Sequence, residues 1–371
     1  MYQKITEGNA KLTVPKEKKV SKDLPVFYNP VMKYNRDVSV LLLNAVSNKN
    51  MQIGLPLAGS GVRGVRFLLE LPKNKIKKIS FNDKDPEAIK IIKKNIKDND
   101  IKAKKDVINI TNQDANLFLL NSTGFDYIDI DPFGSPNPFL DSSIKRISRD
   151  GILAVTATDT GCLCGSFSAP CLRKYWAKPL RNELMHEIGL RIFIRKIQLI
   201  GAQAEKALIP ILSYNKDHYF RIFFRVEKGR QKVDKLMKFY NFLLFNNKTG
   251  EFKLSKYNSE KGFNEYAGPI WIGELVDKAL IKKINNNIKD NSDKELIKFL
   301  EVLGNESNIN TVGFYDIHAI IKRNKIKNNI KTSELINKIE NSKHKACRSH
   351  FSRYGIKSSI GFKEFIKLLK K

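Results

Sequence analysis

Short runs of β-branched and aromatic residues alternate with helical patterns along residues 1–227. This alternation is typical of a parallel sheet whose crossover helices cover both faces. The expected parallel strands are Met51–Ala58, Lys78–Asn82, Asp106–Ile110, Phe125–Ile130 and Gly151–Thr156. The pattern therefore predicts an α/β domain with a doubly wound, mostly parallel sheet.

Two further strand-like runs, Ala207–Ser213 and His218–Val226, flank the polar turn Asn215-Lys216-Asp217. So short a connection joins antiparallel neighbours, and it predicts a hairpin that closes the sheet. We expect this domain to span residues 1–227, with an N-terminal extension at 1–50. Helical patterns follow at Val233–Phe245, Ile272–Ile284 and Asp293–Leu303, and they predict a smaller, mainly α domain over residues 228–371.

The charge balance limits the partners of the chain. Among 371 residues there are 67 Lys and Arg against 38 Asp and Glu, a formal net charge of +29. Such an excess attracts polyanions and favours nucleic acid, although many lysines could simply solvate helix faces. The sequence has no apolar run long enough for a membrane span and no signal-peptide pattern, so we expect a soluble cytoplasmic protein. The four cysteines form no CxxC pair, and we expect reduced thiols.

Glycines and acids follow the expected strands where a cofactor would bind. Gly59 and Gly61 lie at a strand-to-helix turn, which lets the backbone approach a ligand. Asp83 ends the next strand, where the dinucleotide-fold logic places a carboxylate on ribose hydroxyls. Together they suggest a cofactor containing adenosine, with a dinucleotide site or a turn without a ligand as alternatives. Asp114 could accept the hydrogens of an adenine amino group, cap the helix at Asn116–Leu120, or do both.

The segment Asp131-Pro132-Phe133-Gly134 follows the fourth strand, beside the expected cofactor crevice. An exocyclic base amine is a poor nucleophile because its lone pair is delocalised into the ring. A carboxylate that accepts its N–H and an aromatic face that fixes the base would orient it for attack, and proline stiffens the turn that presents both. The segment therefore favours an amino-methyltransferase over a packed acidic turn.

At this point the sequence resembles a known family, the Trm1 tRNA methyltransferases, which dimethylate N2 of guanine 26 with S-adenosyl-L-methionine. The matching stretches run almost from end to end: Ile5-Thr6-Glu7-Gly8, Phe27-Tyr28-Asn29-Pro30, Asn35-Arg36-Asp37, Gly61-Val62-Arg63-Gly64-Val65-Arg66-Phe67, Asn82-Asp83, Asp131-Pro132-Phe133-Gly134, Thr158-Asp159-Thr160, Ala267-Gly268-Pro269-Ile270-Trp271 and Arg348-Ser349-His350-Phe351. The resemblance implies a class I methyltransferase domain, tRNA as the partner, and a C-terminal domain that binds tRNA.

The resemblance also implies roles for individual residues. Cofactor contacts would come from Arg36, Arg66, Asp83, Asp114 and Ala115, in addition to the glycines of the turn. The guanine would be held by Asp131, Phe133 and Phe27, with the base flipped out between the two rings. The alternatives are a methyltransferase acting on an adenine or cytosine amine in rRNA or DNA, and an RNA-binding protein without activity.

One departure from the family concerns metal. Several members carry cysteine pairs suited to zinc, whereas Leu244–Tyr266 contains no cysteine here. We expect no metal, and apolar packing in place of one, from Phe242, Phe245, Phe252, Tyr257, Phe263 and Tyr266. Cys162, Cys164 and Cys171 have a spacing that fits a metal site poorly, and we expect them to be buried thiols. The basic aromatic segment Arg173-Lys174-Tyr175-Trp176 could clamp RNA or complete a core.

Overall fold

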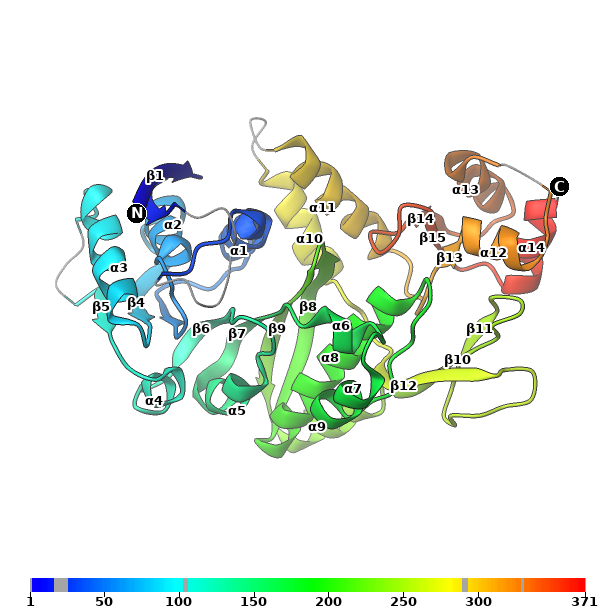
Figure 1. Ribbon diagram of the computed structural model, residues 1–371, viewed down its shortest axis with the longest axis horizontal. Coiled ribbons are helices and arrows are strands. Elements are labelled where there is room, and N and C mark those ends of the chain that lie inside the picture. The colour runs from blue at the N-terminus through cyan, green and yellow to red at the C-terminus, as the bar shows by residue number, and fades with distance from the viewer. Residues whose placement is uncertain (1, 17–25, 103–105, 289–292, 328–329, 371) are drawn as a thin grey trace.

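The computed structural model describes residues 2–16, 26–102, 106–288, 293–327 and 330–370. In this part of the chain a seven-stranded sheet has the order β5-β4-β3-β6-β7-β9-β8 (Figure 1). Its strands are β3 (Met51–Leu55), β4 (Ile76–Asn82), β5 (Ile108–Thr111), β6 (Phe125–Ile130), β7 (Ile147–Ala157), β8 (Lys206–Lys216) and β9 (Tyr219–Lys228). The five strands β5, β4, β3, β6 and β7 are parallel to one another, and β9 pairs antiparallel with β7 on one side and with β8 on the other. The predicted doubly wound sheet and its closing hairpin are confirmed.

Helices cover both faces of this sheet, because neighbouring strand residues point to opposite sides. Tyr127 of β6 belongs to the core under α1 (Lys33–Ala45), α2 (Val62–Glu70) and α3 (Pro86–Asp98). Ile128, the next residue, belongs to the core under α4 (Ala115–Leu120), α5 (Asn137–Arg146) and α8 (Met185–Gln203). The short helices α6 (Thr160–Leu163) and α7 (Ser168–Tyr175) follow the carboxyl end of β7 (Figure 1).

The N-terminal extension forms a hairpin of β1 (Tyr2–Glu7) and β2 (Ala10–Pro15), which packs on α2 and α3. The short 3-10 helix η1 (Pro30–Met32) then leads into α1. Strand β1 ends at Glu7, and the hairpin turn at Gly8 lies against Arg66 and Glu70 of α2. The extension thus brings an acidic side chain from the chain start to the sheet domain.

The C-terminal region has more residues in helices than in strands, as expected, but its described part also contains two three-stranded sheets that the sequence did not predict. The first is made of β10 (Tyr240–Phe245), β11 (Phe252–Ser255) and β12 (Glu265–Trp271), and the second of β13 (Tyr315–Asp316), β14 (Ala346–Arg348) and β15 (Gly355–Ser358). Its helices are α9 (Arg230–Met237), α10 (Lys278–Asn286), α11 (Lys294–Glu306), α12 (Ile317–Arg323), α13 (Thr332–Asn341) and α14 (Phe362–Lys370).

The helix predicted over Val233–Phe245 was wrong in its second half. The chain ends α9 at Met237, and the aromatic run that follows pairs as β10 with β11 and β12. The helix predicted from Ile272 begins only at Lys278, where Asp277 accepts the Leu280 N–H as an N-cap. The prediction around Asp293–Leu303 is confirmed by α11.

The aromatic packing predicted for this region is confirmed in part. Phe245 is fully buried, and Phe242 packs edge-to-face against Tyr266 with ring centroids 6.0 Å apart. The ring centroids of Phe252 in β11 and Tyr315 in β13 lie 5.5 Å apart, so this pair connects the two small sheets. Tyr257 is 76% exposed, so its inclusion in the predicted packing was wrong.

A buried charge cluster fastens the end of the chain to the sheet domain. Glu187 of α8 accepts hydrogen bonds from Arg191 Nε at 2.9 Å, Lys357 Nζ at 3.1 Å and the Gly313 N–H at 3.0 Å. Burial alone would raise the pKa of Glu187, but the charges of Lys357 and Arg191 lower it to about 2. Because α10 and α11 also fold back onto the core beneath α1, the division at residue 228 stays a prediction. Among the helices of the described residues, none has the length and apolar character needed to cross a membrane.

Candidate active site

The glycine turn after β3 lies against the carboxyl end of β4. Gly59 and Gly61 have φ of +52° and +76°, in the left-handed region that favours glycine. Asp83 Oδ2 accepts the Gly59 N–H at 2.8 Å, and Oδ1 accepts the Asp85 N–H at 3.0 Å. Burial raises the pKa of Asp83. A side chain on Gly59 would meet the Phe27 carbonyl at 2.9 Å, so the segment before η1 closes directly over the turn.

Asp114 follows β5 and caps α4, which begins at Ala115. Its Oδ1 accepts the N–H groups of Asn116 at 2.8 Å and Leu117 at 3.2 Å. The helix-capping interpretation is therefore confirmed, while the contact with adenine stays a prediction. Asn82, at the carboxyl end of β4, connects the segments that follow β3 and β5, because its side chain donates to the carbonyls of Pro56 and Gln113 at 3.0 and 2.9 Å.

Asp131, at the end of β6, forms an ion pair with Arg63 of α2. Arg63 is itself held by Ser39 Oγ at 2.8 Å, by Asn35 Oδ1 at 3.0 Å and by Asp129 at 3.5 Å. Only Oδ2 of Asp131 receives a hydrogen bond from the described residues. The carboxylate is thus fixed by one oxygen, with its side chain 18% exposed at the strand end.

A second guanidinium supports this pair from below. Arg221 of β9 is fully buried and donates to both oxygens of Asp129, at 2.9 and 2.7 Å, while the Tyr127 hydroxyl also donates to that carboxylate. Burial would raise the pKa of Asp129, but the charges of Arg221 and Arg63 hold it below its usual range. Asp129 therefore remains ionised and serves as a second anionic partner of Arg63, in addition to Asp131.

The rings of Phe27 and Phe133 are in direct contact. Their centroids lie 4.1 Å apart at an interplanar angle of 65°, an edge-to-face arrangement. Phe133 is 45% exposed, and its turn is fastened by Thr158 Oγ1, which accepts the Gly134 N–H at 2.7 Å. No space for a base exists between the two rings in this arrangement, so a base can lie between them only if the rings separate.

Arg36 and Arg66 are buried and already have acidic partners. Arg36 donates to both oxygens of Glu7, at 2.7 and 2.6 Å. Arg66 pairs with Glu7 at 3.0 Å, Asp37 at 2.7 Å and Glu70 at 2.7 Å. Burial would raise the pKa of Glu7, but Arg36 and Arg66 lower it to about 2. The structure thus places both arginines in one buried network, whose acid comes from the N-terminal hairpin.

The predicted site residues do not all line the same space. A cavity of about 40 Å³ is lined by Phe27, Arg36 and Asp131, together with Arg63 and the turn residues Ala58 and Ser60. Arg66 does not line this cavity and lies instead beside a separate one with Gly8 and Asp37.

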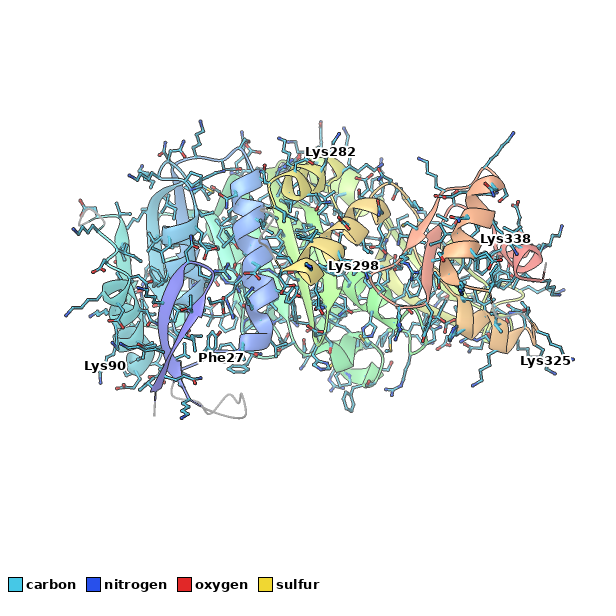
Figure 2. The ribbon with its side chains drawn as sticks, turned by 90° about the horizontal axis from the view of Figure 1, so that it is seen from above. Phe27, Lys90, Lys282, Lys298, Lys325 and Lys338 are labelled. Atoms are coloured by element: carbon cyan, nitrogen blue, oxygen red, sulfur yellow. The ribbon has the colours of Figure 1, made fainter. Side chains whose placement is uncertain are left out.

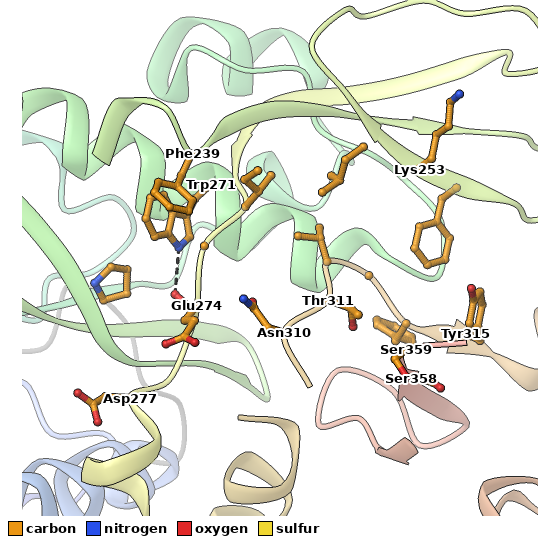
Figure 3. Close-up of a pocket in the computed structure, with 18 of the residues that line it drawn as sticks. Phe239, Lys253, Trp271, Glu274, Asp277, Asn310, Thr311, Tyr315, Ser358 and Ser359 are labelled. Carbon is orange, nitrogen blue, oxygen red and sulfur yellow. Dashed lines mark hydrogen bonds between the residues drawn. The ribbon is translucent and has the colours of Figure 1, made fainter. Parts of the chain in front are cut away.

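A much larger cavity, of about 880 Å³, lies between β8 and the two small sheets (Figure 3). Phe239 and Trp271 face Asn310 and Thr311 across it, and the Trp271 indole donates to the Glu274 carbonyl at 3.0 Å. Its carboxylates, Glu274 and Asp277, follow β12 and do not lie at the carboxyl ends of the parallel strands, where a nucleotide cofactor would bind.

The sequence reasoning missed two residues that organise the site. Arg63 and Glu7 stood inside segments noted for their resemblance to the family, yet neither received a role. A charged residue on the buried face of a helix was the available signal for Arg63, because such charges are nearly always paired. Glu7 carried no comparable signal, since its partners come from α1 and α2.

The expectation of buried thiols is confirmed for Cys164 and Cys171 and was wrong for Cys162, which is only partly buried. Cys164 and Cys171 are buried, and burial raises the pKa of each to about 12, which opposes thiolate ligation. Cys164 Sγ lies 3.4 Å from His186 Nδ1. The described residues contain no group of three or more His, Cys, Asp or Glu side chains suited to a metal ion.

The strand-end residues fit a cofactor that contains adenosine. The backbone of the glycine turn and the start of α2 present N–H groups, and Asp83 presents a carboxylate from the neighbouring strand. Together with a guanidinium-held, partly exposed carboxylate just after β6, this arrangement is compatible with an S-adenosyl-L-methionine-dependent methyltransferase, and the comparisons with known proteins show that class. The model of the N2,N2-dimethylguanosine tRNA methyltransferase family matches residues 8–370, and the chain belongs to that family.

The relatives agree along nearly their whole lengths. The tRNA (guanine(26)-N(2))-dimethyltransferase of Pyrococcus horikoshii is 38% identical over 388 residues, covering 99% of this chain and 98% of the relative. The tRNA (guanine(26)-N(2)/guanine(27)-N(2))-dimethyltransferase of Aquifex aeolicus is 37% identical over 379 residues, covering 98% and 94%. The structure of Trm1 from P. horikoshii with S-adenosyl-L-methionine superposes with a TM-score of 0.90 at 36% identity, covering 100% of both chains. The resemblance seen in the sequence is confirmed.

Proposed function

We propose that this chain transfers methyl groups from S-adenosyl-L-methionine to the exocyclic N2 of guanine 26 in tRNA. The observation that carries the proposal is the position of Asp131, fixed by Arg63 at the carboxyl end of β6 and beside the glycine turn. The family membership and the names of the relatives support the same substrate. The net charge of +29 suits a polyanionic partner.

In this proposal Asp131 orients the amine. Its Oδ2 is bonded to Arg63, so Oδ1 is the oxygen that accepts an N2–H of the guanine. The acceptor aligns the nitrogen lone pair and stabilises the positive charge that develops on nitrogen during transfer. The bound cofactor supplies an electrophilic methyl group on a sulfonium. Because the transfer is direct, the chain provides no covalent nucleophile.

Phe27 and Phe133 hold the guanine in this proposal. Their contact at 4.1 Å has to open, since a base between the rings must pack against both of them, and aromatic rings pack with centroids roughly 4.5–7 Å apart. The half-exposed Phe133 is the ring with room to move, whereas the carbonyl of Phe27 is bonded to the Ser60 N–H at 3.1 Å. The base therefore enters by displacing Phe133 from Phe27.

The cofactor contacts follow from the strand ends. We assign Asp83 to the ribose hydroxyls, Asp114 and Ala115 to the adenine, and Gly59 and Gly61 to the close backbone approach. Arg36 lines the cavity next to Asp131 and would face the amino acid part of the cofactor. Arg66 does not line that cavity, so its role is to hold Glu7, which in turn holds Arg36.

The alternatives predict different products. A methyltransferase for adenine or cytosine amines would act on a different base, and an inactive RNA-binding protein would yield no product. Guanine 27 is a second candidate position, because the A. aeolicus relative is named for both positions. Asp83 and Asp131 remain in place, which favours an active enzyme over an inactive one.

The test uses the purified chain, S-adenosyl-L-methionine with a labelled methyl group, and unmodified tRNA transcripts. Three transcripts carry guanine at 26 alone, at 27 alone, or at neither position. We expect label in N2-methylated guanosine from the first transcript, identified by mass spectrometry of the nucleosides. Label in methyladenosine or methylcytidine, or the same yield from the third transcript, would contradict the proposal.

A further inference from the structure

The charge of the chain does not by itself locate an RNA-binding face. Figure 2 shows that Lys90, Lys282, Lys298, Lys325 and Lys338 are spread from one end of the long axis to the other. A specific face must therefore be found from local geometry, where exposed aromatic and basic side chains occur together next to the proposed site.

Such a place is the α7 surface, which we define as Phe167, Leu172, Arg173, Lys174 and Trp176. The three apolar side chains are 62%, 51% and 46% exposed, among the most exposed large apolar residues of the described chain. Arg173 and Lys174 are exposed, and neither forms an ion pair with any residue that the structure describes. An apolar surface that carries unpaired cations is complementary to RNA, whose bases stack and whose phosphates are anionic.

The α7 surface is fastened to the turn that carries Phe133. The Tyr175 hydroxyl lies 3.0 Å from Ser135 Oγ and donates to Asp159 at 2.7 Å. Asn137 Nδ2 donates to the Lys174 carbonyl at 3.1 Å. Tyr175 itself is fully buried, so its side chain connects α7 to the Asp-Pro-Phe-Gly turn and takes no part in the surface.

Trp176 has an unusual backbone for its size. Its φ is +56°, a left-handed conformation at the helix end where glycine is the common choice. Its N–H bonds the Leu172 carbonyl at 3.1 Å, and Lys178 is paired with Gly268 of β12 at 2.9 and 2.8 Å, so the flanking chain holds it there. A strained conformation that persists with a bulky, half-exposed side chain points to a function of that side chain.

One side of the indole is already covered. Lys196 of α8 is 6% exposed, and its Nζ lies 2.9 Å from the centroid of the Trp176 ring. The cation packs against the ring and fixes its orientation, while Trp176 remains 46% exposed to the solvent. The ring is therefore a fixed stacking platform.

We infer that the α7 surface binds the tRNA substrate, with an unpaired base next to the target guanine stacked on Trp176 and flanking phosphates on Arg173 and Lys174. This inference rests on the proposed function for the identity of the RNA. The platform and the Phe133 turn share one rigid connection, so RNA bound on the first is presented to the second.

The test is Trp176→Gly, which removes the ring while the backbone conformation favours the new residue. We expect the Kd for a labelled, unmodified tRNA transcript to rise by about 5- to 150-fold, the range for loss of one base–aromatic stack. Trp176→Phe should retain most of the affinity because a ring remains. The Kd for S-adenosyl-L-methionine should stay unchanged in both. The matched control is Tyr257→Ala, which removes another exposed aromatic, 76% exposed and on the β11–β12 connection, without an effect on tRNA.

Arg173→Gln and Lys174→Gln test the phosphate contacts. Each should reduce the slope of log K against log salt by about 0.7–0.9. An unchanged tRNA affinity in Trp176→Gly would overturn the inference. The inference would also be overturned if Trp176→Gly abolished self-association of the protein and left tRNA binding intact. The α7 surface would then be a contact with a second copy of the chain. Direct binding separates this test from the proposed function, because the product analysis can fail while the Kd still changes.

Discussion

Arg63 bridges Asp131 and Asp129, the two carboxylates of the β6 strand end. It pairs with Asp131 Oδ2 on one side and lies 3.5 Å from Asp129 Oδ2 on the other. Asp129 Oδ2 also lies 2.7 Å from Nη2 of the fully buried Arg221, so two guanidinium groups neutralise the charge of this carboxylate. Asp129 therefore anchors Arg63, and Arg63 in turn fixes the carboxylate of Asp131, the group that we propose to accept a hydrogen bond from the guanine amine.

Replacing Arg63 by methionine should lower kcat by about 10- to 100-fold, because a displacement of about 1 Å at the reacting group costs roughly 10²-fold. The kcat of Arg63→Lys should lie between those of the wild type and Arg63→Met, since an ammonium group can pair with a carboxylate but cannot reproduce the two-pronged geometry of a guanidinium. Steady-state kinetics on the guanine-26 transcript measure both variants. The Kd for the cofactor should change little.

A double variant separates positioning from general destabilisation. In the Asp131→Ala background, Arg63→Met should cause no further loss of turnover, because its effect acts through that carboxylate. Additive losses would show that Arg63 acts on the fold or on the cofactor, and its positioning role would then be excluded.

Asp131→Ala should lower kcat by about 10²–10³-fold, the usual effect of removing one well-placed electrostatic contact. The tRNA Kd should remain close to that of the wild type, because the contact acts mainly in the transition state. Single-turnover methylation together with direct tRNA binding gives both numbers. Retention of more than about a tenth of kcat would remove Asp131 from the mechanism.

Asp83→Ala should weaken S-adenosyl-L-methionine binding by about tenfold or more, since hydrogen bonds to a charged group contribute roughly 1.5–3 kcal/mol. The change also releases the Gly59 N–H that Asp83 accepts at 2.8 Å. Calorimetric titration of the folded variant measures it. The control is Asp141→Asn, an acid on α5 whose side chain is 66% exposed. If Asp83→Ala binds the cofactor as tightly as the wild type, the ribose assignment is wrong.

The sequence revealed the parallel sheet because its signals are local: each strand is a short apolar run followed by a turn. The acids at the strand ends, Asp83 and Asp131, could be predicted from the sequence for the same reason, since the carboxyl ends of parallel strands meet at one edge of the sheet. The pairing of Asp131 with Arg63 was not accessible, because it joins residues 68 positions apart whose side chains carry no periodic signal.

Tertiary contacts also explain the misread C-terminal region. The stretch from Tyr240 to Phe245 is compatible with a buried helix or a buried strand, and periodicity alone does not separate them. Pairing with β11 and β12 decides for a strand. Trp176 is a similar case, because no sequence pattern predicts a left-handed conformation for a tryptophan.

Chelators should not affect the protein. Leu244–Tyr266 contains no cysteine that could bind zinc. This segment belongs instead to the sheet of β10, β11 and β12, which packs through the buried Phe245 and the Phe242–Tyr266 pair. We expect that no metal contributes to folding, and therefore that EDTA leaves both Tm and methyl transfer unchanged. Elemental analysis of the purified protein checks the same point. Stoichiometric zinc or a lower Tm in EDTA would contradict it, and Cys162, Cys164 and Cys171 would be the first ligands to replace.

Glu7→Gln should destabilise the protein in a pH-dependent way. The folded pKa of Glu7 is lowered from 4.5 to about 2, so its ionised form is favoured by folding. Its contribution is fully present above pH 4.5 and is lost as the pH falls towards 2. A shift of this size corresponds to about 3 kcal/mol at neutral pH.

Urea unfolding of wild type and Glu7→Gln at several pH values measures this contribution. The difference in unfolding free energy should be largest at neutral pH, because the variant leaves Arg36 and Arg66 without their shared anion. It should shrink steadily between about pH 5 and the acid limit of folding. The matched control is Glu87→Gln, an acid on α3 whose side chain is 45% exposed and pairs only with Lys90 among the described residues. A difference that stays constant with pH would mean that Glu7 acts through packing, and that its charge does not hold the two arginines.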